Sequence, residues 1–241
     1  MTSKINRIRQ LINLIFTKEQ LRSFLFLEII AGILYSIASL IFFVYITTAV
    51  LQSQTIIIDN LISNFILTLR NPYLTKVMLS LSFLGSQAIM AGTILIAIFL
   101  TLKKHRKETY IFSVLLLMGA LASFFLKYLF KVPRPIISAL FNENSYSYPS
   151  GHALNSLLFY ATITYFIYHF TKNKKVSFLV GIICAILIFL IGFSRIYLGV
   201  HHPSDVIAGY LFGFLLFVVT ILVDKTITFF RLIRETSATL E

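Results

Sequence analysis

Long apolar runs set the pattern of hydrophobic and polar positions along this chain. Each is about as long as a helix needs to cross a hydrocarbon layer about 30 Å thick. The runs cover residues 24–50, 74–102, 109–130, 153–170, 176–193 and 203–223. None alternates apolar and polar residues with a period of two, as the strands of a membrane β-barrel do. The pattern predicts an all-α, polytopic membrane protein with six transmembrane helices.

Two further segments have the pattern of short amphipathic helices at the membrane interface. In residues 3–22, four apolar residues share one helical face: Ile5, Ile8, Ile12 and Ile15. Arg7 and Arg9 flank the other face, which is typical of a basic helix lying on the inner leaflet. A frayed basic tail stays open as an alternative. A cleaved signal peptide is disfavoured, because the first apolar run is longer than a signal sequence needs.

The second segment covers residues 55–73, between the first two apolar runs. It carries an apolar stripe with Asp59, Asn60 and Asn64 mostly on the opposite face. The Asn71–Pro72 pair ends a helix here, because the residue before a proline avoids helical backbone angles. We expect a short helix in the outer interface.

The distribution of positive charge orders the runs across a membrane. Most of the 21 Lys and Arg residues lie in four segments, 4–22, 103–107, 172–175 and 225–234. With six spans these four segments fall on one side, and segments rich in Lys and Arg face the cytoplasm. The sequence predicts a multi-pass protein of the cytoplasmic membrane with both termini in the cytoplasm.

Composition agrees with a membrane protein and excludes several other classes. The 241 residues are 58% hydrophobic and 12% charged, with a mean hydropathy of +0.87. Soluble domains are about 45–50% apolar and about 25% charged, so a soluble protein and a disordered chain are both excluded. The single cysteine excludes a disulfide scaffold. The net charge of +12 does not indicate nucleic-acid binding, because the basic residues lie between apolar runs.

The chain shows no internal repeat and no second globular domain. We expect a basic amphipathic N-terminal segment over residues 1–23, a six-helix membrane domain over 24–224 and a cytoplasmic tail over 225–241.

Ionisable residues gather in the third and fifth loops, which this topology places together on the outer side. Such groups near membrane depth mark functional sites. Lys127, Arg134 and Arg195 would repel one another in one pocket unless they bind a polyanion. Phosphate suits them, because a guanidinium pairs with two of its oxygens at once.

The start of the fourth apolar run offers further groups for the same anion. Pro149 ends any preceding helix, and Ser150 is a favoured N-cap residue. The free backbone amides of a helix start point at an anion. Gly151 would let a ligand approach the backbone closely.

Two histidines and one carboxylate complete the candidate site. His201 and Asp205 are four residues apart, on one face of the helical turn that Pro203 begins. A carboxylate on one imidazole nitrogen leaves the other free to attack phosphorus. His152 can then protonate the leaving oxygen as a general acid. These residues predict cleavage of a phosphate ester through a covalent intermediate.

Together these residues resemble the signature of the type 2 phosphatidic acid phosphatase family, membrane lipid phosphatases related to vanadium haloperoxidases. The signature reads Lys-x6-Arg-Pro, then Pro-Ser-Gly-His, then Ser-Arg-x5-His-x3-Asp. Residues 127–205 carry all of its fixed identities at the right spacings. Three motifs in order are far more specific than one short motif.

The resemblance implies a role for each matched residue. His201 would be the nucleophile that forms a phosphohistidine, Asp205 would orient it, and His152 would act as general acid and then as base for water. The implied phosphate-binding residues are Lys127, Arg134, Ser150, Gly151 and Arg195. The family works without a metal, so we expect neither a metal site nor another cofactor. Glu143, in the same loop, is expected to be solvated, and Glu28 either to snorkel or to pair with a basic neighbour.

We therefore expect an enzyme, a metal-independent hydrolase that removes a terminal phosphate from a lipid at the outer leaflet. The resemblance implies phosphatidylglycerophosphate, phosphatidic acid, undecaprenyl diphosphate or the phosphate of lipid A as the substrate. The lipid bilayer is the environment, and no obligate protein partner is evident. Two alternatives stay open: a phosphotransferase that passes the phosphate to a second acceptor, and a catalytically silent lipid-binding protein. A transporter or channel is disfavoured, because the middles of the spans are mostly apolar.

Overall fold

The computed structural model describes residues 18–135, 139–141 and 143–237, and the regular elements in this part of the chain are all helices. They are α2 (Lys18–Leu51), α3 (Ile56–Thr68), α4 (Pro72–Leu84), α5 (Gln87–Leu102), α6 (Arg106–Phe130), α7 (Gly151–Thr171), α8 (Lys174–Tyr197) and α9 (Pro203–Ser237). The predicted all-α class is confirmed, and so is the short helix after the first span. The amphipathic helix predicted for residues 3–22 falls almost wholly outside the described residues.

Most long helices have the length and hydropathy of a membrane span. Within the described residues five segments qualify: Arg22–Leu51, Pro72–Leu102, Arg106–Phe130, Lys174–Tyr197 and Pro203–Arg231. The sixth predicted span is α7, whose 21 residues extend about 31 Å. It contacts α5, α6, α8 and α9. A helix enclosed by other helices needs less apolar surface than one that faces lipid, which explains its more polar sequence.

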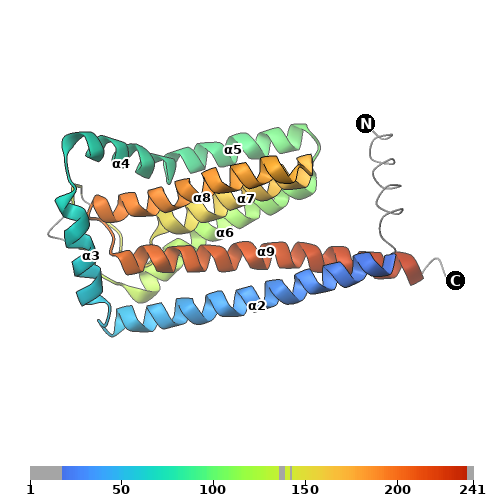
Figure 1. Ribbon diagram of the computed structural model, residues 1–241, viewed down its shortest axis with the longest axis horizontal. Helices are drawn as coiled ribbons and strands as arrows, with labels where there is room; N and C mark the ends of the chain where they lie inside the picture. The colour runs from blue at the N-terminus through green and yellow to red at the C-terminus, as the bar shows by residue number, and fades with distance from the viewer. Residues whose placement is uncertain (1–17, 136–138, 142, 238–241) are drawn as a thin grey trace. The chain divides into compact units, whose positions relative to one another are not determined.

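Residues 38–217 form one compact unit that contains the candidate site. In this unit α3 lies across one end of α6, α7 and α8 (Figure 1). The α6–α7 connection and the α8–α9 loop meet at that end, where the amide of Leu140 donates to the carbonyl of Leu198 at 3.0 Å. The α5–α6 and α7–α8 turns meet at the opposite ends of α6 and α7, where the rings of His105 and Phe170 lie 4.8 Å apart.

Close approach at two glycines fixes the start of α7 between its neighbours. A Cβ on Gly209 of α9 would lie 2.5 Å from the carbonyl oxygen of Ser150. A Cβ on Gly151 would lie 2.6 Å from the hydroxyl of Ser123 in α6. Any side chain at these positions would push α6 or α9 away from the first turn of α7.

The second apolar run is not one continuous helix. Gly85 and Ser86 separate α4 from α5. A Cβ on Gly85 would lie 2.4 Å from Cγ2 of Ile191 and 3.3 Å from the ring of His152. The hydroxyl of Tyr160 donates to the carbonyl of Leu84 at 3.1 Å, which satisfies an acceptor that the helix end leaves open. The break therefore borders the candidate site.

The described residues at the two ends of the chain, 18–37 and 218–237, form a second unit from parts of α2 and α9. Nζ of Lys225 lies 2.7 Å from Oε2 of Glu28, which confirms the expected pairing of this glutamate. Helix α9 continues to Ser237, so most of the predicted tail over 225–241 prolongs the last helix.

Candidate active site

His201 lies in the loop between α8 and α9, and both of its ring nitrogens have a partner. Nδ1 lies 3.2 Å from Oδ2 of Asp205, as the four-residue spacing predicts, and Nε2 lies 3.3 Å from Nη1 of Arg134. A carboxylate accepts and a guanidinium donates, so this geometry favours a proton on Nδ1 and a lone pair on Nε2. The nitrogen available for attack is therefore Nε2.

Ser147 contacts both members of the His201–Asp205 pair and was not among the predicted site residues. It is fully buried, its hydroxyl donates to Oδ2 of Asp205, and the same hydroxyl lies 3.3 Å from Nδ1 of His201. The backbone amide of His202 donates to the same carboxylate oxygen at 2.8 Å. These donors fix the orientation of the carboxylate that holds the imidazole. In the sequence, only its position two residues before Pro149 could have indicated that Ser147 belongs to the site.

The cations beside His201 are held by backbone carbonyls. Nε of Arg134 donates to the carbonyl of Ser145 at 2.6 Å, and Nη1 donates to the carbonyl of Val200 at 2.7 Å. Nζ of Lys127 donates to the carbonyl of Tyr146 at 2.7 Å. The loop after α6 thus positions both cations, because its carbonyls replace the water that long side chains otherwise retain.

Glu143 is the second residue that the sequence analysis misjudged, because it is not solvated but ion-paired. Its Oε2 lies 2.5 Å from Nη2 of Arg134, and its Oε1 pairs with Nη2 of Arg195. Arg195 is almost fully buried, lies in the last turn of α8 and also donates to the hydroxyl of Ser82. The two guanidinium groups are therefore close enough to share one anion. A signal existed, since Glu143 is the only acidic residue of the predicted third loop.

The start of α7 carries the remaining predicted residues. Ser150 is the N-cap residue, but its hydroxyl makes no hydrogen bond to the helix. Among the described residues, two buried donors of the site lack a hydrogen-bond partner: Oγ of Ser150 and Nε of Arg195. A buried donor without a partner costs free energy unless a ligand or water satisfies it. A Cβ on Gly151 would collide with the side chain of Ser123, so the close approach that this glycine allows is to α6.

Burial and neighbouring cations lower the pKa of His201 well below the ordinary histidine value. Loss of hydration on burial is the larger cause, followed by the positive charges of Arg195, Arg134 and Lys127. All these effects disfavour the imidazolium form. His201 is therefore a neutral base at neutral pH, with an unprotonated Nε2 that faces Arg134.

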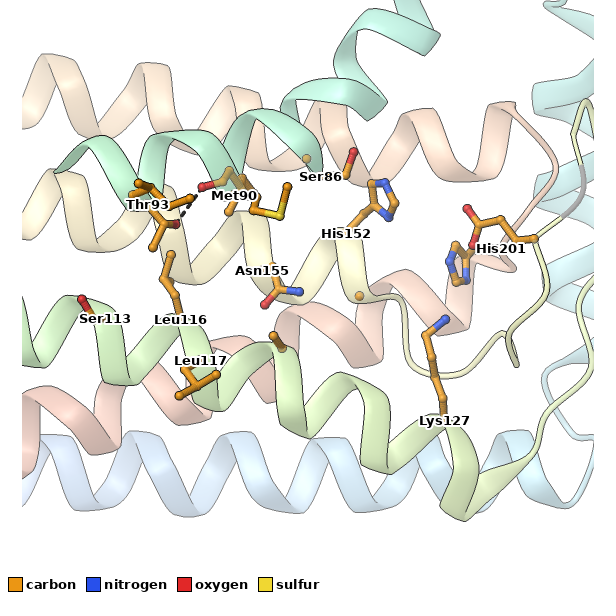
Figure 2. A pocket seen from close by; sticks show the side chains of 16 residues that line it. Ser86, Met90, Thr93, Ser113, Leu116, Leu117, Lys127, His152, Asn155 and His201 are labelled. Atoms are coloured by element: carbon orange, nitrogen blue, oxygen red, sulfur yellow. Dashed lines mark hydrogen bonds between the residues drawn. The ribbon is translucent and has the colours of Figure 1, made fainter. Parts of the chain in front are cut away.

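A pocket of about 570 Å³ joins the candidate residues to an apolar wall. Figure 2 shows the side chains of Lys127, His152 and His201 directed into one part of it, from α6, α7 and the α8–α9 loop. We call this part, lined by Lys127, Glu143, His152 and His201, the polar end. The apolar end is lined by Ile89, Met90 and Ile94 of α5 and Leu116 and Leu117 of α6.

A smaller pocket of about 280 Å³ lies beside the first. Arg195 and Phe141 line it, and Ser86, Glu143 and His152 line both pockets. The helix break at Ser86 thus belongs to the wall of the site. All eight predicted site residues therefore lie in the unit of residues 38–217, around the polar end of the pocket.

Comparisons with known proteins place the chain in a family. A model of the PAP2 superfamily matches residues 107–229. The chain is 33% identical over 205 residues to phosphatidylglycerophosphatase B of Bacillus subtilis, covering 82% of this chain and 99% of that protein. It is 38% identical over 81 residues to an undecaprenyl-diphosphatase of Sulfolobus acidocaldarius, covering 34% and 35% of the two chains.

A solved structure agrees over most of the chain. The crystal structure of a transmembrane PAP2-type phosphatidylglycerolphosphate phosphatase from Bacillus subtilis matches with a TM-score of 0.75 and 29% identity, covering 80% of this chain and 96% of that one. This chain belongs to the PAP2 superfamily, and the resemblance drawn from its motifs is confirmed. The names of these relatives support a membrane lipid phosphatase as its class.

Proposed function

We propose that this protein hydrolyses a terminal phosphate from a membrane lipid at the outer leaflet, through a phosphohistidine on His201. The observation that carries the proposal is the pocket with a cationic, histidine-bearing polar end and an apolar end formed by α5 and α6. A pocket of this kind fits an amphiphile whose headgroup is a phosphate and whose remainder is hydrocarbon.

Phosphate binds between Arg134 and Arg195 in this proposal. These guanidinium groups already share one anion, the carboxylate of Glu143. A phosphate carries more charge and more acceptor oxygens than a carboxylate, and it can also accept from the unpartnered donors on Ser150 and Arg195. Lys127 adds a third positive charge. The substrate therefore competes with Glu143 for the arginines.

His201 and His152 divide the chemistry between them. Nε2 of His201 attacks phosphorus, the bond from phosphorus to the bridging oxygen breaks, and His152 gives that oxygen its proton. His152 then takes a proton from water, which attacks the phosphohistidine and releases inorganic phosphate. Asp205 holds the imidazole through Nδ1 and stabilises its positive charge in the transition state. No step requires a metal ion.

The proposed orientation places the site outside and both termini in the cytoplasm. The basic loops 103–107 and 172–175 border the same end of the bundle, since Glu108 at the start of α6 pairs with His169 near the end of α7 at 3.4 Å. Loops rich in Lys and Arg face the cytoplasm. The polar end of the pocket lies at the other ends of α6 and α7 and would face outward.

Phosphatidylglycerophosphate is the first substrate to test, because the relative named for it aligns over 82% of this chain. Undecaprenyl diphosphate is the second, because the relative named for it aligns over 81 residues. Both combine a terminal phosphate with a long hydrocarbon, which the two ends of the pocket suit.

The test is phosphate release by the purified full-length protein in lipid nanodiscs, in the presence of EDTA. Phosphatidylglycerophosphate, undecaprenyl diphosphate, phosphatidic acid and lipid A are offered in parallel, with His201→Ala as control. We expect metal-independent release that the substitution abolishes. Release only when a second acceptor is added would make the protein a phosphotransferase. Binding of lipid without release under any condition would make it a silent lipid-binding protein.

A further inference from the structure

Asp59 is a buried carboxylate that the chemistry of the pocket does not use. It lies in α3 and is only 5% exposed, whereas the next residue, Asn60, is exposed. The sequence places it mostly opposite the apolar stripe of a helix in the outer interface. A carboxylate buried this deeply requires hydrogen-bond donors around it.

The donors come from a single residue at the start of α9. Oδ1 of Asp59 accepts from the backbone amide of Ser204 at 2.9 Å, and Oδ2 accepts from the Ser204 hydroxyl at 2.7 Å. The first amides of a helix have no partner within it, and a carboxylate there also interacts favourably with the helix dipole. Asp59 therefore caps α9 from a helix 145 positions away in the chain.

The capped turn is the one that carries the proposed nucleophile. Ser204 directly precedes Asp205, whose carboxylate binds the imidazole of His201 and the amide of His202. A shift of this turn would move both members of the His201–Asp205 pair relative to Arg195, which Glu143 and Ser82 hold from outside the loop.

A second attachment holds the other end of the same loop. Arg70, just after α3, donates from Nε and Nη2 to the carbonyl of Tyr197 at 3.0 and 2.7 Å. The Tyr197 hydroxyl accepts from the amide of Asn71 at 3.2 Å. Tyr197 ends α8, so the loop between α8 and α9 is tied to the α3 region on both sides of His201.

We infer that Asp59 is a positioning residue for catalysis, which sets the attack geometry of His201 by capping α9 through Ser204. The inference rests on the proposed function of His201 but concerns a residue that touches neither substrate nor nucleophile. A misplacement of about 1 Å can cost about 100-fold in rate. Arg134 also binds the carbonyl of Ser145, and Arg195 binds Glu143 and Ser82. The phosphate-binding groups thus keep partners outside the capped loop, so the defect belongs in kcat rather than in KM.

The experiment compares Asp59→Ala, Asp59→Asn and the matched control Asn60→Ala in full-length protein in nanodiscs. Asp59→Ala lowers kcat about 10- to 100-fold with KM within about twofold of wild type. Asp59→Asn, which keeps the shape and a carbonyl acceptor, recovers most of the activity. Ser204→Ala combined with Asp59→Ala loses no more than Asp59→Ala alone, because the two residues act through one contact.

Amide hydrogen exchange of residues 198–206 gives a readout that does not depend on activity. Asp59→Ala accelerates exchange in this segment and Asn60→Ala does not. Unchanged exchange, or faster exchange with unchanged kcat, overturns the inference. If wild type releases no phosphate from any lipid, the proposed function fails and so does the positioning role for catalysis, while the exchange data still decide whether the cap exists.

Discussion

The two ends of the pocket are held in place by different forces. At the polar end, His201 is buried and its partners Asp205, Arg134 and Ser147 fix it through directional hydrogen bonds. At the apolar end, Met90 and Leu117 are 66% and 59% exposed and contact their surroundings through nondirectional packing. The first arrangement defines one geometry, whereas the second would adapt, in the proposed function, to different hydrocarbon chains.

This difference separates two kinds of kinetic effect. Hydrogen bonds that orient reacting groups matter most in the transition state, so their loss lowers kcat. Apolar contacts with a lipid tail are the same in the ground state and in the transition state, so their loss raises KM. Substitutions at the two ends therefore test the comparison directly.

The largest effect is expected for the nucleophile. His201→Ala lowers kcat on the order of 10⁴-fold, because it removes the only group proposed to form the covalent intermediate. His105→Ala, a histidine at the α5–α6 turn, is the matched control and retains full activity. Both variants are compared by steady-state phosphate release. Residual turnover above a few per cent in His201→Ala would contradict a phosphohistidine at this position.

Arg134→Gln comes next, with a loss of about 100- to 1,000-fold in kcat/KM, typical of removing a group that stabilises transition-state charge. Lys103→Gln, a basic residue at the α5–α6 turn, is the control. The loss should appear for every lipid phosphate, since Arg134 contacts Glu143 and His201 at the polar end. A loss confined to one lipid would instead assign Arg134 to headgroup selection.

The same variant tests the charge state of His201 through pH. The charged groups around it are Arg195 on α8, Lys127 on α6, Arg134 after α6, His152 on α7 and Asp205 on α9. Burial and the cations lower the pKa of His201, so the neutral form persists into acid and the acid limb of kcat/KM lies below the ordinary histidine value of about 6.5.

Removing the positive charge of Arg134 relieves part of this effect. The pKa of His201 then rises, more of the imidazole is protonated at a given pH, and the acid limb moves toward higher pH. The measurement is kcat/KM across pH for wild type, Arg134→Gln and Lys103→Gln. A shift toward lower pH in Arg134→Gln would mean that a different group controls the acid limb.

Ser147→Ala has a smaller effect at the same end, a loss of about 10- to 30-fold in kcat with little change in KM. Asp205 keeps its hydrogen bond from the amide of His202 but loses the hydroxyl that fixes it from the other side. Ser156→Ala removes a buried hydroxyl that donates only locally, to the carbonyl of Ala153, and controls for the general cost of the substitution. Equal losses in the two variants would show that Ser147 supports stability alone.

The residues that these predictions use differ in how far the sequence could identify them. The pairing of His201 with Asp205 follows from a four-residue spacing, and the six spans follow from runs of apolar residues. Ser147, Glu143 and Asp59 could not be found this way, because each acts on a partner 52 or more positions away. Periodicity identifies the faces of one helix but does not tell which remote segments meet. The break at Gly85 and Ser86 was also missed, and the close approach of Ile191 in α8 to Gly85 is likewise nonlocal.

The smallest predicted effect lies at the apolar end and completes the comparison. Met90→Ala removes about 1 kcal/mol of tail contact at most, so KM rises about two- to fivefold while kcat is unchanged. Met118→Ala on α6 is the control, because this half-exposed methionine does not line the pocket. Because the apolar end of the pocket is adaptable, the increase in KM should be similar for lipids with tails of different length at equal surface concentration. A fall in kcat in Met90→Ala would show instead that the tail helps to align the phosphate with His201, and the two ends of the pocket would then act as one unit.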